Sequence, residues 1–107
     1  MAKRNSLPTH PGILLKEEFL DPIGLRPGTL ARALGVSRDR ISEITKAARD
    51  ITPDTALRLS AFFETTPEFW LNLQSHYDLV MAEQDFDEAL LSSIREEGGA
   101  LVAGSPG

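Results

Sequence analysis

The sequence has 107 residues, of which 41% are hydrophobic, and this suits one compact domain with a single core while leaving little room for a second. The absence of cysteine excludes disulfide bonds and thiolate metal ligands, and a formal net charge of −5 argues against the basic excess that is usual in nucleic-acid binders. No apolar run approaches the roughly 20 residues of a membrane span, so we expect a cytoplasmic protein without a membrane partner.

The charges are unevenly distributed along the chain. Residues 26–49 contain six arginines or lysines against two acidic residues, whereas residues 64–97 contain nine acidic residues against one arginine. Salt screens exposed charges beyond about 8 to 10 Å, so a basic segment can attract phosphates even in an acidic protein. The middle of the chain is therefore a candidate for nucleic-acid binding.

Proline and glycine mark the ends of the first two predicted helices. The first begins at Pro11 or Gly12, runs to Leu20 and stops at the sequence DPIGL, because a residue before proline avoids helical dihedral angles. Ile23 and Leu25 should then return the chain to the core. The second covers residues 27–34, since proline suits a first helical turn, and ends at Gly35, which readily adopts the left-handed conformation.

The third predicted helix follows directly. Ser37 is placed to cap it by accepting a backbone N–H from the first turn, which begins at Arg38. Ile41 and Ile44 lie at i and i+3 and should face the core. The polar residues between them then point outward.

Two later helices share a Thr-Pro start, with threonine as the cap and proline as the first helical residue. The pairs are Thr52-Pro53 and Thr66-Pro67. The second of these helices is apolar on more than one face, which suggests that part of its surface meets a partner.

The chain ends in a segment of different composition. Residues 85–107 predict a short amphipathic helix, capped by Asp85 or Asp87 and ended by Gly98 and Gly99, and then a flexible tail. We expect residues 1–84 to form the main domain and residues 85–107 to form a C-terminal extension. Every convincing segment has helical period, so the predicted fold class is all-α.

Two helices joined by a short turn containing glycine form the helix-turn-helix arrangement. The first helix lies across the DNA backbone while the second enters the major groove, about 12 Å wide, with its N-terminal turn toward the bases. Arginine there can contact guanine or phosphate, and aspartate can accept from cytosine. The candidate DNA-binding residues lie on the predicted helix that begins at Arg38 or directly beside it. They are Ser37, Arg38, Asp39, Arg40, Ser42, Glu43, Lys46 and Arg49.

A second interpretation of this helix needs no DNA. Arg38 and Arg40 would then belong to a solvated face and pair with Asp39 and Glu43. The concentration of positive charge on this one segment favours the DNA-binding interpretation.

Four stretches together resemble the HigA-type antitoxins of bacterial toxin–antitoxin systems, which lie within the Xre/Cro helix-turn-helix family. The resemblance covers about residues 10–79, and the most specific part combines His10-Pro11-Gly12 with the run TPEFWLNLQ that begins at Thr66. The stretches are HPGILLKEEFLDPIGL, LARALGVSRDRISEI, ITPDTALRLSAFF and TPEFWLNLQSHYDL.

This resemblance implies a fold and a function. The fold would be a five-helix lambda-repressor-like helix-turn-helix domain, and the chain allows an extra C-terminal helix. The protein would form a homodimer largely through the helix that begins at Pro67, repress its own operon by binding a palindromic operator, and neutralise a HigB-type toxin, an mRNA-cleaving RNase of RelE-like fold. Its partners would be double-stranded operator DNA, the toxin and a second copy of itself.

The sequence departs from the family pattern in three places. Pro27-Gly28 stands where members often have a Gln-type residue, so only the backbone or Thr29 can contact phosphate there. The segment TKAARDI lacks the glycine common after the recognition helix, so we expect Ala47 and Ala48 to lengthen that helix by part of a turn. Residues 80–107 lie beyond the resemblance.

A homodimer is also expected on physical grounds. One short recognition helix contacts only a few base pairs, so useful specificity needs two modules on half-sites about one helical turn apart. Core packing should account for at least two of Phe69, Trp70, Leu73 and Tyr77. The candidate interface residues, expected to be partly exposed, are Trp70, Leu71, Gln74 and Tyr77.

Two surfaces are candidates for binding the toxin. A toxin that binds mRNA should be basic, which favours the acidic residues 64–97, although that acidic stretch could serve only as a solvated face. The resemblance instead suggests the first helix, where Lys16, Glu17, Glu18 and Asp21 could face the toxin.

Three other function classes compete with an antitoxin. A solitary Xre-type transcriptional repressor without a toxin is the nearest alternative, and a helical adaptor that has lost DNA binding is another. An enzyme is disfavoured, because His10 and His76 are the only histidines and no phosphate loop or paired-histidine spacing occurs. We therefore expect no catalytic residue, no metal site and no cofactor.

Overall fold

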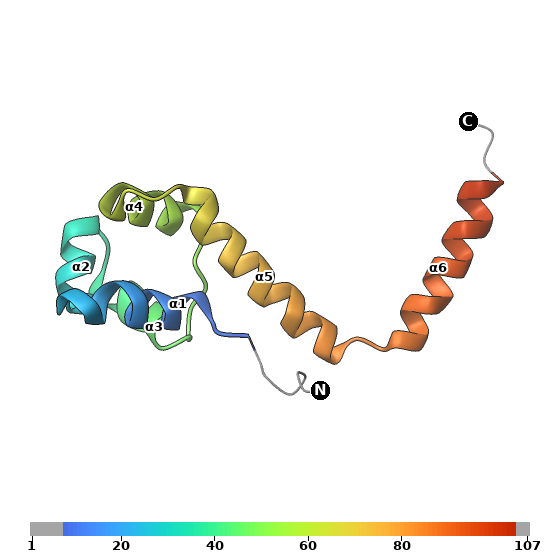
Figure 1. Ribbon diagram of the computed structural model, residues 1–107, viewed down its shortest axis with the longest axis horizontal. Coiled ribbons are helices and arrows are strands. Elements are labelled where there is room, and N and C mark those ends of the chain that lie inside the picture. Colours follow the sequence, from blue (N-terminus) through green and yellow to red (C-terminus); the bar gives the residue numbers. More distant parts are fainter. Residues whose placement is uncertain (1–7, 105–107) are drawn as a thin grey trace.

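The chain folds into a helical body from which a two-helix arm extends (Figure 1). The computed structural model describes residues 8–104, and every regular element in that range is helical, which confirms the all-α prediction. The α-helices are α1 (Pro11–Leu14), α2 (Pro27–Leu34), α3 (Arg38–Thr45), α4 (Pro53–Phe63), α5 (Pro67–Asp85) and α6 (Glu88–Ala103).

The first helical segment ends within the predicted sequence DPIGL. From α1 the chain continues as a π-helical segment (Leu15–Leu20) and then as a 3-10 turn (Asp21–Ile23), and it ends at Gly24 in the left-handed conformation. The predicted end at Leu20 coincides with the end of the π-helical segment, and the sequence DPIGL adds a single 3-10 turn, because proline lacks only a donor that the start of a helical turn does not use. The prediction that Ile23 returns to the core is wrong, since its side chain is 65% exposed.

Local capping explains the remaining helix starts. The hydroxyls of Ser37, Thr52 and Thr66 accept hydrogen bonds from backbone N–H groups in the first turns of α3, α4 and α5. Gly35 ends α2 with φ +75°, as its position predicts.

His10 caps α1 and joins it to two other parts of the body. Its Nδ1 accepts from the Gly12 N–H at 2.9 Å, while its Nε2 lies 3.4 Å from Asp50 Oδ1. The ring also packs edge-on against Tyr77, with 4.9 Å between ring centroids. This buried residue therefore links α1, the segment after α3, and α5, and the prediction that it caps or packs the first helix is confirmed.

The core of the body lies where α1 to α4 meet the first half of α5. Its fully buried members come from every one of these elements or from the segments beside them. They include Leu15, Leu20, Leu30, Ile41, Ile44, Leu59 and Trp70.

The recognition helix ends earlier than predicted. Helix α3 stops at Thr45, and Ala47 adopts the left-handed conformation at φ +62°, so Ala47 and Ala48 do not lengthen it. The Ala48 N–H donates to the Glu43 carbonyl at 2.8 Å, which closes the helix as a glycine would. The turn directs Ile51 into the core.

Replacing Ala47 with glycine should therefore raise the free energy of unfolding by about 0.5–1 kcal/mol, because glycine adopts a positive φ without steric cost. Urea denaturation followed by circular dichroism measures this. The matched control is Ala48→Gly at the next position, where φ is not positive and glycine should bring no gain. Equal shifts in the two variants would contradict the explanation.

The arm consists of the second half of α5 and all of α6. Helix α6 runs through Gly98 and Gly99 to Ala103, so the predicted end at these glycines and the flexible tail are wrong up to Gly104, and residues 105–107 lie outside the described range. Asp87 caps the helix, one of the two predicted caps. A radius of gyration of 18.8 Å, against about 13 Å for a compact chain of 100 residues, reflects this extension.

Candidate DNA-binding interface

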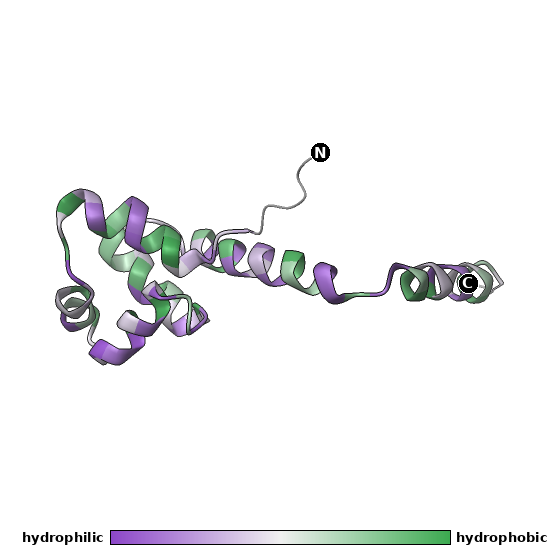
Figure 2. Cartoon of the chain, turned by 90° about the horizontal axis from the view of Figure 1, so that it is seen from below, coloured by the Kyte–Doolittle hydropathy of each residue, from purple (hydrophilic) through white to green (hydrophobic). Residues whose placement is uncertain are grey.

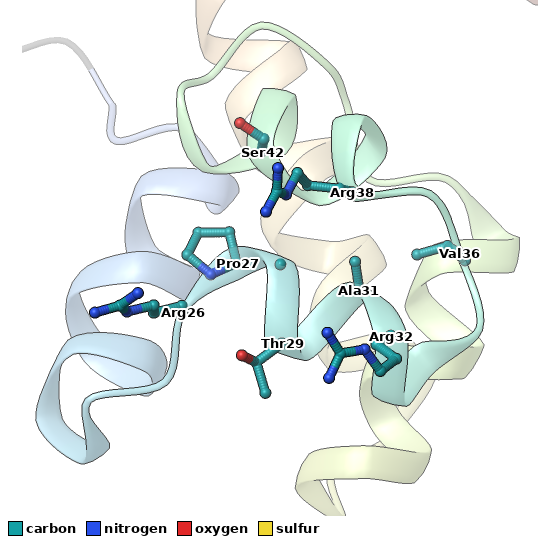
Figure 3. A pocket seen from close by; sticks show the side chains of 9 residues that line it. Arg26, Pro27, Thr29, Ala31, Arg32, Val36, Arg38 and Ser42 are labelled. Carbon is teal, nitrogen blue, oxygen red and sulfur yellow. The ribbon is translucent and has the colours of Figure 1, made fainter.

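Helices α2 and α3 pack together as a helix-turn-helix, and a groove of about 630 Å³ lies between them (Figure 3). Three arginines border it: Arg26 before α2, Arg32 on α2 and Arg38 at the start of α3. None of them takes part in an ion pair within residues 8–104. The full lining is Arg26, Pro27, Gly28, Thr29, Ala31, Arg32, Val36, Arg38 and Ser42.

Three of the predicted DNA-binding residues line this groove, namely Thr29, Arg38 and Ser42. Sequence reasoning counted Arg26 and Arg32 in the basic segment but did not assign them to the site. Their positions are the signal that could have identified them. Arg26 directly precedes the proline that starts α2, and Arg32 lies on the exposed face of α2. Both line the same groove as Arg38.

Arg40 lies away from the groove and connects α3 to α4. Its Nη1 donates to Asp54 Oδ2 at 2.5 Å and to Thr55 Oγ1 at 3.4 Å. Arg58 donates to the same Asp54 oxygen at 3.0 Å and to the Leu34 carbonyl at 2.7 Å. Hydrogen bonds from Arg40 and then Arg58 hold the pKa of Asp54 below its usual range. This network anchors α3 and α2 to the first two turns of α4.

Glu43 and Arg49 form another ion pair. Arg49 Nε and Nη2 lie 2.9 Å and 2.7 Å from Glu43 Oε1. The alternative pairing of Arg38 and Arg40 with Asp39 and Glu43 is wrong, because Arg40 pairs with Asp54 and Glu43 with Arg49.

The other candidate residues differ in whether their side chains are available to contact DNA. The Ser37 hydroxyl is already used as the cap of α3, where it accepts from the Arg40 N–H at 3.1 Å. Asp39 and Lys46 are exposed at the two ends of α3. Both are accessible to a ligand that approaches this helix.

The predicted dimer residues are more buried than expected. Trp70 is 0% exposed and Gln74 is 6% exposed, so the prediction that they are partly exposed is wrong. Gln74 Oε1 accepts from the buried Ile51 N–H at 2.7 Å, and this contact holds the segment after α3 against α5. Leu71 and Tyr77 are half-buried.

The part of the chain that the structure describes shows no cluster of three histidines or acidic residues that could hold a metal ion. None of its helices combines the length and the apolar character that crossing a membrane requires.

Comparisons with known proteins also identify a helix-turn-helix in this chain. The helix-turn-helix family model matches residues 16–70. Virulence-associated protein I of Dichelobacter nodosus is 53% identical over 85 residues, which cover 78% of this chain and 79% of the relative. Antitoxin HigA-1 of Vibrio cholerae is 40% identical over 79 residues, which cover 74% of each chain.

A solved structure resembles the fold directly. Pseudomonas aeruginosa antitoxin HigA, determined with the higBA promoter, superimposes with a TM-score of 0.71 at 41% identity, covering 84% of this chain and 94% of that one. The chain therefore belongs to the helix-turn-helix family and, within it, to the HigA-type antitoxins.

Proposed function

We propose that this protein is an autoregulatory antitoxin, which represses its own operon by binding a palindromic operator and neutralises a HigB-type, mRNA-cleaving toxin. The observation that carries the DNA-binding part is the groove between α2 and α3, bordered by three arginines without an ion-pair partner in residues 8–104. The promoter complex of the Pseudomonas aeruginosa relative supports it.

The DNA contacts divide by position on the motif. We assign Ser42, on α3, to the major groove, with Asp39 as an acceptor beside it, and Arg38 to either a base edge or a phosphate at the same groove. Thr29, Arg26 and Arg32 should contact the phosphate backbone. Lys46 and Arg49, at and beyond the end of α3, should also contact phosphates.

Arg40, Glu43 and Ser37 act chiefly within the protein in this proposal. Arg40 pairs with Asp54, Glu43 pairs with Arg49, and Ser37 caps α3. Each fixes the orientation of the recognition helix, and DNA binding by Arg40 or Glu43 would require the ion pair to open or be shared.

A homodimer is supported by the apolar surface of the arm. Leu79, Phe86 and Leu91 line a small apolar groove at the bend between α5 and α6, and Leu90 and Ile94 are 48% and 54% exposed on α6. Helix α6 has 16 residues and carries Gly98 and Gly99 in its interior, and glycine is a poor helix former, so α6 gains stability from a surface to pack against. Figure 2 shows the arm lying away from the body, which leaves a second copy to cover it.

The division of the chain follows from this arrangement. Residues 1–84 would form the DNA-binding domain, which also begins the dimer contact, and residues 85–107 would form the extension that completes it. The end of α5 at Asp85 supports that boundary.

Placing glutamate at both Leu90 and Ile94 should convert the dimer to monomer, because two charges would enter an apolar contact. Analytical ultracentrifugation at several concentrations measures this. The matched control is glutamate at both Ser92 and Ser93, which adds the same charge to exposed positions of the same helix and should leave the dimer intact. A parent protein that is already monomeric would refute the dimer.

The toxin part is tested by capture from the native host. Tagged protein is purified with nuclease present, and the retained proteins are identified by mass spectrometry. A small basic RNase at near-equal amount would support neutralisation. Its absence, with promoter DNA retained when nuclease is omitted, would favour a solitary Xre-type repressor.

Charge reversal then identifies the surface that meets the toxin. Lysines in place of Glu96 and Glu97 test the acidic arm, and lysines in place of Glu17 and Glu18 test the first helix; all four side chains are exposed. The pair whose reversal releases the toxin marks its binding surface, since like charges repel across an interface. Operator binding should be unchanged in both pairs.

A further inference from the structure

The side chain of Arg38 lies over the backbone of α2 at Gly28. A Cβ atom built on Gly28 would lie 3.2 Å from Arg38 Nε, 3.7 Å from Nη2 and 3.9 Å from Cγ. Figure 3 shows the Arg38 side chain running from α3 toward Pro27, with Ser42 beside it. Part of the Arg38 side chain therefore occupies the space that the side chain of any other residue at position 28 would enter.

Backbone conformation does not explain this glycine. Within residues 8–104 the glycines with positive φ are Gly24 and Gly35, and Gly28 is not among them. Glycine is a poor helix former, and Gly28 is the second residue of α2. The property that Gly28 contributes is space for Arg38.

We infer that Gly28 is a positioning residue for Arg38. By leaving this space, it lets the guanidinium lie in the groove that Arg26 and Arg32 also line before DNA arrives. A side chain that is already ordered loses less rotamer entropy when it binds, so its contact with DNA is stronger.

This inference rests on the proposed DNA-binding function. It adds Gly28, a residue without a side chain, to the residues that determine how the site binds DNA. The ligand of Arg38 is an acceptor oxygen or nitrogen on DNA, from either a backbone phosphate or the guanine edge, since a guanidinium binds both. The two sources differ in whether the contact depends on sequence.

The test is a double-mutant cycle on operator affinity. Arg38→Ala should weaken binding to the protein's own promoter DNA about tenfold or more. Gly28→Leu should cause a similar loss by displacing Arg38, and Gly28→Ala a smaller one of several-fold. The variant that combines Gly28→Leu with Arg38→Ala should bind no more weakly than Arg38→Ala alone, because both changes remove the same contact.

Two controls separate positioning from a structural role. Gly28→Ala replaces a poor helix former with a good one, so its melting temperature should not fall although its affinity does. Gly99→Ala makes the same change at an exposed site on α6, where a Cβ meets nothing within 4 Å, and should leave affinity unchanged.

The outcomes are distinct. The inference is overturned if Gly28→Leu lowers operator affinity as much in the Arg38→Ala background as it does in the parent protein. It is also overturned if both Gly28 variants bind the operator with parental affinity. Binding of the parent protein to promoter and unrelated DNA with equal affinity would instead refute the proposed function, and the inference with it. A loss on both DNAs in the Gly28 variants supports the inference with a phosphate as the ligand, and a loss on promoter DNA alone supports it with a base edge.

Discussion

Replacing Gly12 with alanine should destabilise the protein by about 3 kcal/mol or more, or prevent folding altogether. A Cβ at this position would lie 1.6 Å from the carbonyl oxygen of Ile44 and 2.5 Å from its carbonyl carbon. Both are backbone atoms, so no side-chain rotation relieves the clash. The Ile44 carbonyl also accepts from the Ala47 N–H at 3.0 Å, so moving it would disturb the turn that ends α3.

Urea denaturation followed by circular dichroism measures the loss in the Gly12 variant. Gly99→Ala provides the matched control, since it places the same methyl group in open space on an exposed helix and should stabilise α6 slightly. A Gly12→Ala protein of parental stability would show that α1 and α3 do not cross as closely as the structure places them.

Trp70→Ala should lower the free energy of unfolding by about 3–5 kcal/mol, rather than produce a folded monomer. The indole is fully buried, and its ring centroid lies 4.9 Å from that of Phe19 and 5.0 Å from that of Phe69. Its Nε1 donates to Thr65 Oγ1 at 2.8 Å. Alanine would leave a large cavity at the centre of the body and an unused hydroxyl beside it.

Circular dichroism is the suitable probe, because Trp70 is the only tryptophan and fluorescence would be lost with it. Thr65→Val removes the hydrogen bond but keeps the packing, and should cost only about 1 kcal/mol. A Trp70→Ala protein that stays fully stable but becomes monomeric would contradict this assignment and return Trp70 to the dimer interface.

The candidate site was only partly predictable. The sequence placed Arg38 and Ser42 on the exposed side of the recognition helix, because that side follows from helical period and from the positions of Ile41 and Ile44. The partner of Arg40 was not predictable from the helix that carries it. Asp54 lies 14 residues away on α4, and the packing of α4 against α2 brings it within reach.

Helical identity and most helix starts were determined by the sequence alone, because apolar period and capping by Ser37, Thr52, Thr66 and Gly35 act within a few residues of each end. Tertiary structure decided which apolar and polar side chains of α5 are buried and where α3 stops. Gln74 is buried because it satisfies the Ile51 N–H, 23 residues away, and Ala47 accepts a left-handed conformation in the turn that leads Ile51 into the core. These outcomes depend on contacts between distant segments, whose free energy exceeds the local preferences that a sequence pattern reveals.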